Sequence, residues 1–443
     1  MRKSKNIILY LPDLFISDLD EYLVKNPPKF IYKIEYFYYI VHYLSEQQIK
    51  YKKKQVYRLD LKYLRTVTVS NIMCHVTFLK KGEFIVTNGS YQSGRESLKY
   101  VLNEKFIGST AKIELEKKCR LSRRIVKKIT SRKAHYNRFE PFLKSMYKEL
   151  MKLELDYDKS EEWIRNNANE KQMASYLISI NQIHDKRYRY CKRNKTNNRL
   201  DTNLTNLKSD LRQFIIGDYV SIDLKNSQPF LLGILIDAII DQRETLCCYL
   251  QYEKLTKSFG VKGIKDVLLF HQNEEKRNMV NFKPFFDSVL NGVFYDEFTK
   301  NHLDEITRNQ VKEMMFGVLF SKNYDYSSHH RFVPYESDKK SFESVYPFVY
   351  YVIKTLKNKD YKNLSIFLQK FESYLFIDCI AKELVDNGII PFTIHDSVIV
   401  KIEDIDKAID IMNSVFKRVL GSIPALDIKN LKEESNQIHD CII

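Results

Sequence analysis

Hydrophobic residues recur at helical spacing over residues 30–50 and again over residues 71–79. The apolar runs at 84–87 and 99–106 are typical of strands. Turn-forming pairs lie between these segments, at Lys81-Gly82, Asn88-Gly89 and Ser93-Gly94. The pattern therefore predicts helices followed by a two-stranded wing within residues 1–110.

Helices followed by a wing are typical of domains in which one helix lies in a nucleic-acid groove and the wing contacts the backbone. The segment resembles the winged-helix modules of plasmid replication proteins, and residues 91–106 carry the likeness. A small domain that only packs against the rest of the chain is the alternative.

Beyond residue 110 the pattern changes twice. Residues 117–138, KKCRLSRRIVKKITSRKAHYNR, form the densest basic run of the chain and contain almost no acidic residue. Such a run favours contact with phosphates over a merely solvated face. Long helices follow, and from about residue 190 strands alternate with helices. We expect a basic helical region at 111–190 and an α+β region at 191–443.

Four blocks in the second half carry the candidate chemistry. They are RNKTNNRLDTNLTNLKSDLRQFI at 193–215, YVSIDLKNSQPFLLGIL at 219–235, RNQVKEMMFGVLFS at 308–321 and IIPFTIHDSVIVKIED at 389–404. In the second block an apolar strand ends in Asp223 and turns into an apolar helix. In the fourth block two strand-like runs flank His395 and Asp396, which predicts a hairpin turn at that pair.

The third block places two cations and two aromatic residues on one helical face, at Arg308, Lys312, Phe316 and Phe320. Phosphoryl transfer from a nucleoside triphosphate needs two metal ions bridged by carboxylates, and cations that neutralise the triphosphate. Asp223 and Asp396 could supply the carboxylates if their strands are neighbours in one sheet. The cations would then hold phosphates, and the aromatic pair would present a stacking surface to sugar and base.

In this order, the four blocks resemble the palm and fingers of family A DNA polymerases and the related single-subunit RNA polymerases. The resemblance covers about residues 190–405 and implies a right-hand α+β polymerase. Palm and fingers would occupy 191–443, with the fingers at about 237–345 and a thumb-like region at 111–190. It also implies that Asp223 and Asp396 bind two Mg²⁺ ions, or Mn²⁺, with the Leu224 carbonyl as an auxiliary ligand.

The resemblance implies binding roles for further residues. The nucleotide would contact Arg308, Lys312, Phe316, Phe320, Gln228 and His395. The primer and template would contact Thr196, Arg199, Asn206 and Gln369.

Three positions depart from the family's DNA polymerases or RNA polymerases. Gln228 stands where the DNA polymerases carry a Glu that blocks the ribose 2′-OH, and Ser397 after the His-Asp pair is closer to the RNA polymerases. Phe320-Ser321 replaces a Tyr-Gly pair and lacks the hydroxyl that RNA polymerases use when they choose ribose. Residues 1–150 contain no Asp-x-Glu pair, so we expect no proofreading exonuclease.

The leading hypothesis is a template-directed DNA polymerase that extends a nucleic-acid 3′-OH. A primase, RNA polymerase or terminal transferase that uses ribonucleotides is the alternative within the same class. A non-catalytic replication initiator that binds DNA is the alternative from another class.

Composition supports a polyanionic partner. The formal net charge is +16 over 443 residues, which favours nucleic acid and nucleoside triphosphates as partners. There is no apolar stretch long enough to cross a membrane, and the seven cysteines form no Cys-x-x-Cys pair, which excludes a zinc ribbon. We expect a cytoplasmic protein of a bacterial cell or a phage-infected one, and the Lys-, Asn- and Ile-rich composition suggests a mobile element or phage.

Overall fold

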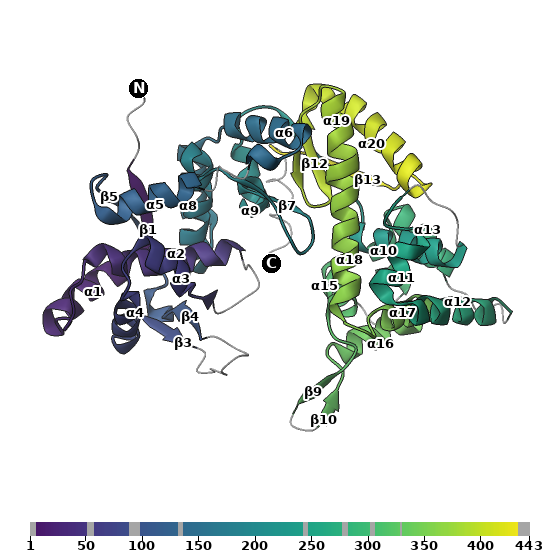
Figure 1. The fold of residues 1–443 in the computed structure, drawn as a ribbon, viewed down its shortest axis with the longest axis horizontal. Helices are drawn as coiled ribbons and strands as arrows, with labels where there is room; N and C mark the ends of the chain where they lie inside the picture. Colours follow the sequence, from purple (N-terminus) through teal and green to yellow (C-terminus); the bar gives the residue numbers. More distant parts are fainter. Residues whose placement is uncertain are drawn as a thin grey trace. The chain divides into compact units, whose positions relative to one another are not determined.

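The computed structural model describes residues 6–50, 57–87, 98–131, 136–241, 247–276, 282–301, 306–327 and 330–432. Helices and small sheets make up these residues, which confirms the predicted α+β class. The chain divides into two compact units (Figure 1). The first comprises residues 1–192, 201–217 and 432–443, and the second comprises residues 193–200 and 218–431.

The first unit contains a two-stranded antiparallel sheet with helices packed on it. β1 (Ile7–Pro12) pairs with β5 (Thr110–Leu115), and Leu9 and Leu11 of β1 are fully buried. Its helices are α1 (Asp13–Lys25), α2 (Ile34–Lys50), α3 (Leu61–Val67), α4 (Ile72–Lys81), α5 (Arg120–Ser131), α6 (Pro141–Lys152), α7 (Tyr157–Asn167), α8 (Glu170–His184) and α9 (Asn203–Asn206).

The two helices and the first strand predicted within residues 1–110 are present, whereas the strand predicted at 99–106 ends at Leu102 and is followed by a 3-10 turn at Glu104–Phe106. The two helices correspond to α2 and α4, and the strands to β3 (Ile85–Thr87) and β4 (Lys99–Leu102). β4 pairs with β3 and with β2 (Tyr57–Arg58) in a three-stranded antiparallel sheet. Asn88-Gly89, Ser93-Gly94 and residues 91–97 lie outside the described residues, so the winged helix stays a prediction.

The basic run forms an amphipathic helix. Leu121, Ile125 and Ile129 of α5 are buried in the core that also contains β1 and α2, whereas Arg123 and Lys127 are exposed. Residues 132–135 of the run lie outside the described part. The N-terminal segment and α5 therefore share one core, and the division into functional domains at residues 110 and 190 stays a prediction.

The second unit is built around a four-stranded antiparallel sheet. The strand order is β11 (Phe392–Ile394), β12 (Ser397–Lys401), β8 (Tyr219–Leu224) and β13 (Leu426–Asn430). The strands of the second and fourth sequence blocks are thus neighbours, as the chemistry required. A separate pair of strands, β6 (Cys191–Arg193) and β7 (Leu200–Thr202), flanks the loop that carries the start of the first block.

Helices surround this sheet and supply most of the core. They are α10 (Ser227–Asp241), α11 (Tyr252–Phe259), α12 (Val261–Lys276), α13 (Phe282–Leu290), α14 (Phe294–Asn301), α15 (Arg308–Phe320), α16 (Glu336–Val345), α17 (Pro347–Leu356), α18 (Lys362–Ser373), α19 (Lys382–Asp386) and α20 (Ile405–Leu420). α18 continues through a π-helical segment, Tyr374–Ala381, into α19, so the three form one long helix (Figure 1). Among the described residues no helix is both long and apolar enough to span a membrane.

Candidate active site

Asp223 and Asp396 come together at one end of the four-stranded sheet. Asp223 on β8 pairs in register with Ser397 on β12, the residue after Asp396. The backbone N–H of Leu224 donates a hydrogen bond to the carbonyl oxygen of Asp396 at 3.1 Å. Ile394 pairs with Ser397, so His395 and Asp396 form the predicted hairpin turn, in which His395 takes a positive φ of 55°. Strand pairing therefore holds the two carboxylates next to each other.

The electrostatics at Asp396 are those of a crowded anionic site. Burial and the negative charge of Asp223 raise the pKa of Asp396, while a backbone hydrogen bond and the positive charge of Arg199 lower it. A hydroxyl from Ser221 donates to Asp223 Oδ2 at 3.1 Å. Two neighbouring carboxylates repel each other when both are ionised, so a bound cation would stabilise the pair.

The donor set fits Mg²⁺ or Mn²⁺. Both ions prefer carboxylate, carbonyl and water oxygens, and Mg²⁺ commonly binds through one or two carboxylates together with substrate phosphates. Across the described ranges, no three His, Cys, Asp or Glu side chains converge as a ready-made metal centre. Asp223 and Asp396 supply two of the oxygen ligands that such an ion prefers. The role of the Leu224 carbonyl stays a prediction.

A third carboxylate, which the sequence analysis missed, lies in the same row of the sheet. Asp427 on β13 pairs in register with Asp223 on the side opposite Ser397. Side chains of directly paired residues lie on the same face of a sheet. An ion pair at 2.8 Å joins Asp427 Oδ2 to Lys429 Nζ. Asp427 thus places a further carboxylate, paired with Lys429, beside Asp223.

The predicted cationic face is present on α15. A capping box of Thr307 and Gln310 begins this helix, and Arg308 and Lys312 extend from its first two turns into solvent. Both cations lie over the ring of Tyr295 on α14, with centroid distances of 5.5 Å for Arg308 and 5.9 Å for Lys312. Arg308 Nε also pairs with Asp296 Oδ1 at 3.1 Å.

Tyr295 connects the cations to the carboxylates electrostatically. Burial raises the pKa of Tyr295 to about 12, and within that shift Arg308 lowers the pKa and Asp396 raises it. Partial burial and the positive charges of Arg308 and Lys429 lower the pKa of Lys312. Arg308 and Lys312 thus lie over a ring whose pKa also responds to the charge of Asp396. No pattern in the sequence had identified it.

The aromatic pair lies farther along the same helix. Phe316 is 44% exposed, Phe320 is half-buried, and their ring centroids are 4.9 Å apart. An exposed aromatic face beside two cations suits a base or a sugar. Their contact with a nucleotide stays a prediction.

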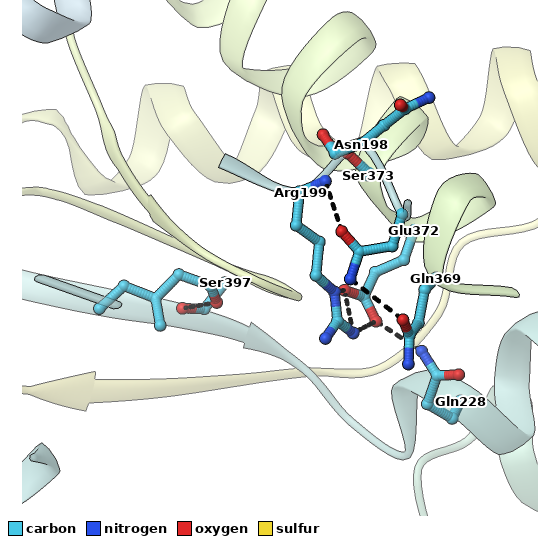
Figure 2. Close-up of polar contacts among 9 residues, drawn as sticks. Asn198, Arg199, Gln228, Gln369, Glu372, Ser373 and Ser397 are labelled. Carbon is cyan, nitrogen blue, oxygen red and sulfur yellow. Dashed lines mark hydrogen bonds and ion pairs between the residues drawn. The ribbon is translucent and has the colours of Figure 1, made fainter. Parts of the chain in front are cut away.

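A further buried carboxylate of the site is Glu372 on α18, which the sequence analysis also missed. Its carboxylate is 1% exposed and accepts hydrogen bonds from Arg199 Nε and Nη2, each at 2.9 Å. Gln228 Nε2 donates to Glu372 Oε2 at 2.5 Å. Figure 2 shows these groups around the end of α18, together with Ser397 on β12. One buried carboxylate thus joins the first block, the second block and the long helix.

Glu372 also responds to the charge of Asp396. Burial, and to a smaller extent the charge of Asp396, raise the pKa of Glu372 to about 7, although Arg199 and Gln228 act in the opposite direction. The sequence feature that could have identified Glu372 is its position as an acidic residue within the largely apolar segment FLQKFESYLF. A buried acid of this kind needs donors, which the structure supplies.

The remaining primer and template candidates are divided between the units. Gln369 Oε1 accepts a hydrogen bond from Asn197 Nδ2 at 3.1 Å, one helical turn before Glu372 (Figure 2). Thr196 is exposed in the same loop, and its N–H donates to Asn194 Oδ1. Asn206 instead belongs to the first unit, where its Nδ2 donates to the Tyr190 hydroxyl at 2.5 Å. Asn206 lines a cavity of about 900 Å³ within that unit.

No protein-family model matches this chain, and no curated protein matches it. Among solved structures it is similar to the POL domain of Pol1 from M. smegmatis in complex with DNA primer-template and dNTP, at 10% sequence identity and a TM-score of 0.26. The match covers 62% of this chain and 55% of that one, so the chain spans about half of that structure. A likeness at this level leaves the assignment of function to the geometry of the site.

Proposed function

We propose that this protein is a nucleotidyltransferase that extends the 3′-OH of a nucleic acid by two-metal phosphoryl transfer directed by a template. The observation that carries this proposal is the pairing of β8 with β12, which holds Asp223 beside Asp396. The two aspartates come from segments far apart in the chain and meet at a strand end and a hairpin turn. Arg308 of the cationic face on α15 lies over Tyr295, and the charge of Asp396 also influences the pKa of Tyr295.

In this proposal the chain's own residues bind and orient the substrates. Arg308 and Lys312 hold the triphosphate, whose charge increases on its oxygens as the leaving group departs. Phe316 stacks on the nucleotide, and Gln369 with Arg199 borders the primer and template. Two divalent ions held by Asp223 and Asp396 would supply activation of the 3′-OH and neutralisation of the phosphates.

Several kinds of nucleotidyltransferase would use a site with these groups. A DNA polymerase without proofreading, a primase or RNA polymerase, and a terminal transferase all need paired carboxylates and triphosphate-binding cations. These enzymes differ in whether they need a template and a primer, and in whether the sugar of their nucleotide is ribose or deoxyribose.

The test is extension of a labelled primer on a DNA template with Mg²⁺, with separate reactions for dNTPs, NTPs and no template. Asp396→Asn should reduce extension by about a thousandfold, since it removes one metal-binding charge. Asp410→Asn, the same change at an exposed position of α20, is the matched control and should extend normally. Products without template would indicate a terminal transferase. If no reaction yields metal-dependent product, or Asp396→Asn extends normally, the catalytic proposal fails and a DNA-binding initiator becomes the better account.

A further inference from the structure

The four-stranded sheet has one apolar face and one polar face. The apolar face contributes to the helix-covered core through Ile222, Leu224, Val398 and Val400. Side chains alternate between the two faces of a strand, so Ser221 and Asp223 of β8 lie on the opposite face. The hydrogen bond between the Ser221 hydroxyl and Asp223 Oδ2, at 3.1 Å, agrees with this placement. The candidate metal ligand Asp223 therefore belongs to the polar face.

The edge strand β13 adds a cation to this polar face. Asp427 pairs in register with Asp223, and Lys429 pairs with Ser221. Directly paired side chains lie on the same face of a sheet, so Asp427 and Lys429 share the face of Asp223. The ion pair of 2.8 Å between Lys429 Nζ and Asp427 Oδ2 draws the ammonium group toward the row that contains Asp223. The Lys429 side chain is 45% exposed, so a substrate can reach it.

The start of β13 is packed against the turn that precedes α14. The N–H of Ala425, one residue before β13, donates to the carbonyl oxygen of Leu290 at 3.0 Å. Gly292 in this turn has a positive φ of 73°, and a Cβ at that position would lie 2.9 Å from the Cβ of Ala425. Tyr295, whose ring lies under both cations of α15, follows three residues later. Close backbone packing thus holds β13 beside the turn that leads to Tyr295.

The charge of Lys429 also acts on the cationic face of α15. Partial burial lowers the pKa of Lys312, and the positive charges of Arg308 and Lys429 lower it further. Cations that repel one another are stabilised by a polyanion that binds them together. A triphosphate that reacts at Asp223 lies over the polar face of the sheet, where it meets Lys429.

We propose that Lys429 binds the triphosphate of the incoming nucleotide together with Lys312, and that Asp427 is the positioning residue that holds the Lys429 ammonium group. This inference rests on the proposed function and adds to it a phosphate-binding residue on a strand that carried no motif. An ammonium group has three N–H donors, so one that donates to Asp427 can also donate to a phosphate oxygen.

The first experiment measures incorporation of one nucleotide into a primer on a DNA template with Mg²⁺, with dATP and ATP in separate reactions. Lys429→Met removes the charge and keeps the length of the side chain. It should raise KM for the nucleotide about tenfold and leave kcat within about threefold, because the phosphates are bound in the ground state and in the transition state alike. KM for pyrophosphate in the reverse reaction should rise similarly. Primer–template affinity should stay within about twofold.

Lys401→Met is the matched control. Lys401 on β12 is exposed and pairs with Glu403 at 3.1 Å, two positions along the chain, as Lys429 pairs with Asp427. In register it faces Tyr219, at the opposite end of β8 from Asp223. This variant should keep the kinetic constants of the wild type. Lys429→Arg keeps the charge and should recover most of the nucleotide affinity.

A double-mutant cycle tests the positioning role of Asp427. Asp427→Asn should raise KM for the nucleotide about threefold when Lys429 is present, and should have no further effect in Lys429→Met. An effect of Asp427→Asn that persists without Lys429 would show that Asp427 acts on Asp223 directly, which overturns its positioning role.

A measurement on the wild type decides the question even if a variant does not fold. Pyrophosphate with Mg²⁺ should slow the acetylation of Lys429 by acetic anhydride severalfold and leave that of Lys401 unchanged, as peptide mass spectrometry can measure. Equal acetylation of Lys429 with and without pyrophosphate would overturn the inference.

The kinetic outcomes separate the two proposals. If the wild type extends primers and Lys429→Met leaves KM for nucleotide and pyrophosphate unchanged, the inference is overturned and the proposed function stands. Loss of primer–template affinity with an unchanged KM for pyrophosphate would also overturn it, since Lys429 would then contact the nucleic-acid backbone. Failure of the wild type to incorporate either nucleotide would count against the proposed function itself, and the inference would fall with it.

Discussion

At the scale of single residues, Arg308 and Lys312 have different surroundings although both lie over Tyr295. Arg308 is paired with Asp296 at 3.1 Å, so part of its charge is already neutralised within the protein. Among the described residues Lys312 has no carboxylate partner within ion-pair distance, and partial burial together with neighbouring cations lowers its pKa. A cation in a positive neighbourhood gains most from a bound polyanion. Lys312 is thus the better placed of the two to bind a triphosphate.

We therefore expect Lys312→Met to reduce kcat/KM for the incoming nucleotide by about 100-fold. Single-nucleotide incorporation at varied nucleotide concentration measures this, and primer–template affinity should stay within about twofold of the wild type. Lys340→Met is the control, because Lys340 is exposed and paired with Glu336 at 2.7 Å. Equal losses in both variants would show that general surface charge, and not this site, binds the nucleotide.

At the scale of elements, two buried lysines donate hydrogen bonds to carbonyl oxygens at, and just beyond, the carboxyl end of α15. Lys357 Nζ donates to the carbonyl oxygen of Val318 at 2.8 Å, and Lys339 Nζ donates to that of Lys322 at 2.5 Å. Both lysines are 2% exposed. The last carbonyls of a helix carry partial negative charge, which favours cations there. These contacts hold the end of the helix that carries the cationic face.

Burial, with a contribution from Lys339, lowers the pKa of Lys357 to about 7, whereas an unfolded lysine titrates near 10.4. Between these values the folded chain binds fewer protons than the unfolded chain, so the free energy of unfolding should rise with pH above about 7. The contribution is about 1 kcal/mol per pH unit between pH 7 and 8.5.

Urea unfolding of the wild type and Lys357→Met at pH 7, 7.75 and 8.5 tests this expectation through the difference between the two proteins. The difference should grow in favour of the wild type as pH rises, and other titrating groups cancel from it. Lys354→Met, an exposed change on the adjacent α17, should keep the slope of the wild type. A constant difference across the pH range would contradict the pKa shift.

At the scale of the whole molecule, two large clusters of buried hydrophobic side chains among the described residues share no member. One contains residues of β1, α2, α4 and α5, and the other contains residues of the four-stranded sheet and of the helices around it. Separate cores in separate units commonly unfold as separate cooperative transitions.

Calorimetry should accordingly resolve two unfolding transitions. Leu11→Ala should lower only one melting temperature, and Phe371→Ala only the other, since each removes a fully buried side chain at a cost of about 3 kcal/mol or more. A single transition that both substitutions shift equally would mean that the two cores unfold as one unit.

The net charge of +16 leads us to predict that DNA affinity depends strongly on salt, because binding to phosphates releases counterions. The logarithm of DNA affinity should fall linearly with the logarithm of salt concentration. Replacing Arg123 and Lys127 on the exposed face of α5 by alanine should reduce the steepness of that line by about 1.8, or about 0.9 for each phosphate that the variant no longer neutralises.

Fluorescence anisotropy from 50 to 300 mM salt measures the slope. The control replaces Lys25 and Lys152, which are paired with Glu21 and Glu149. An unchanged slope in the α5 variant would exclude this face from the DNA interface.

The sequence by itself determined the elements and the order of the chemical groups along them. The strand that carries Asp223, the turn at His395 and Asp396 and the cationic face of α15 all follow from local pattern. Periodicity and turn residues act over a few positions, so they are visible without a fold.

Only the tertiary structure decided which of these groups meet. Glu372 contacts Arg199 across 173 positions and Gln228 across 144, and Tyr295 and Asp427 join the site from elements that carried no motif. Asn206, adjacent in sequence to the first block's loop, belongs to the other unit. The hydrophobic pattern of a helix or strand indicates which of its faces is buried. The partner of a buried charge depends instead on how segments distant in sequence pack together, and local residue spacing does not determine that packing.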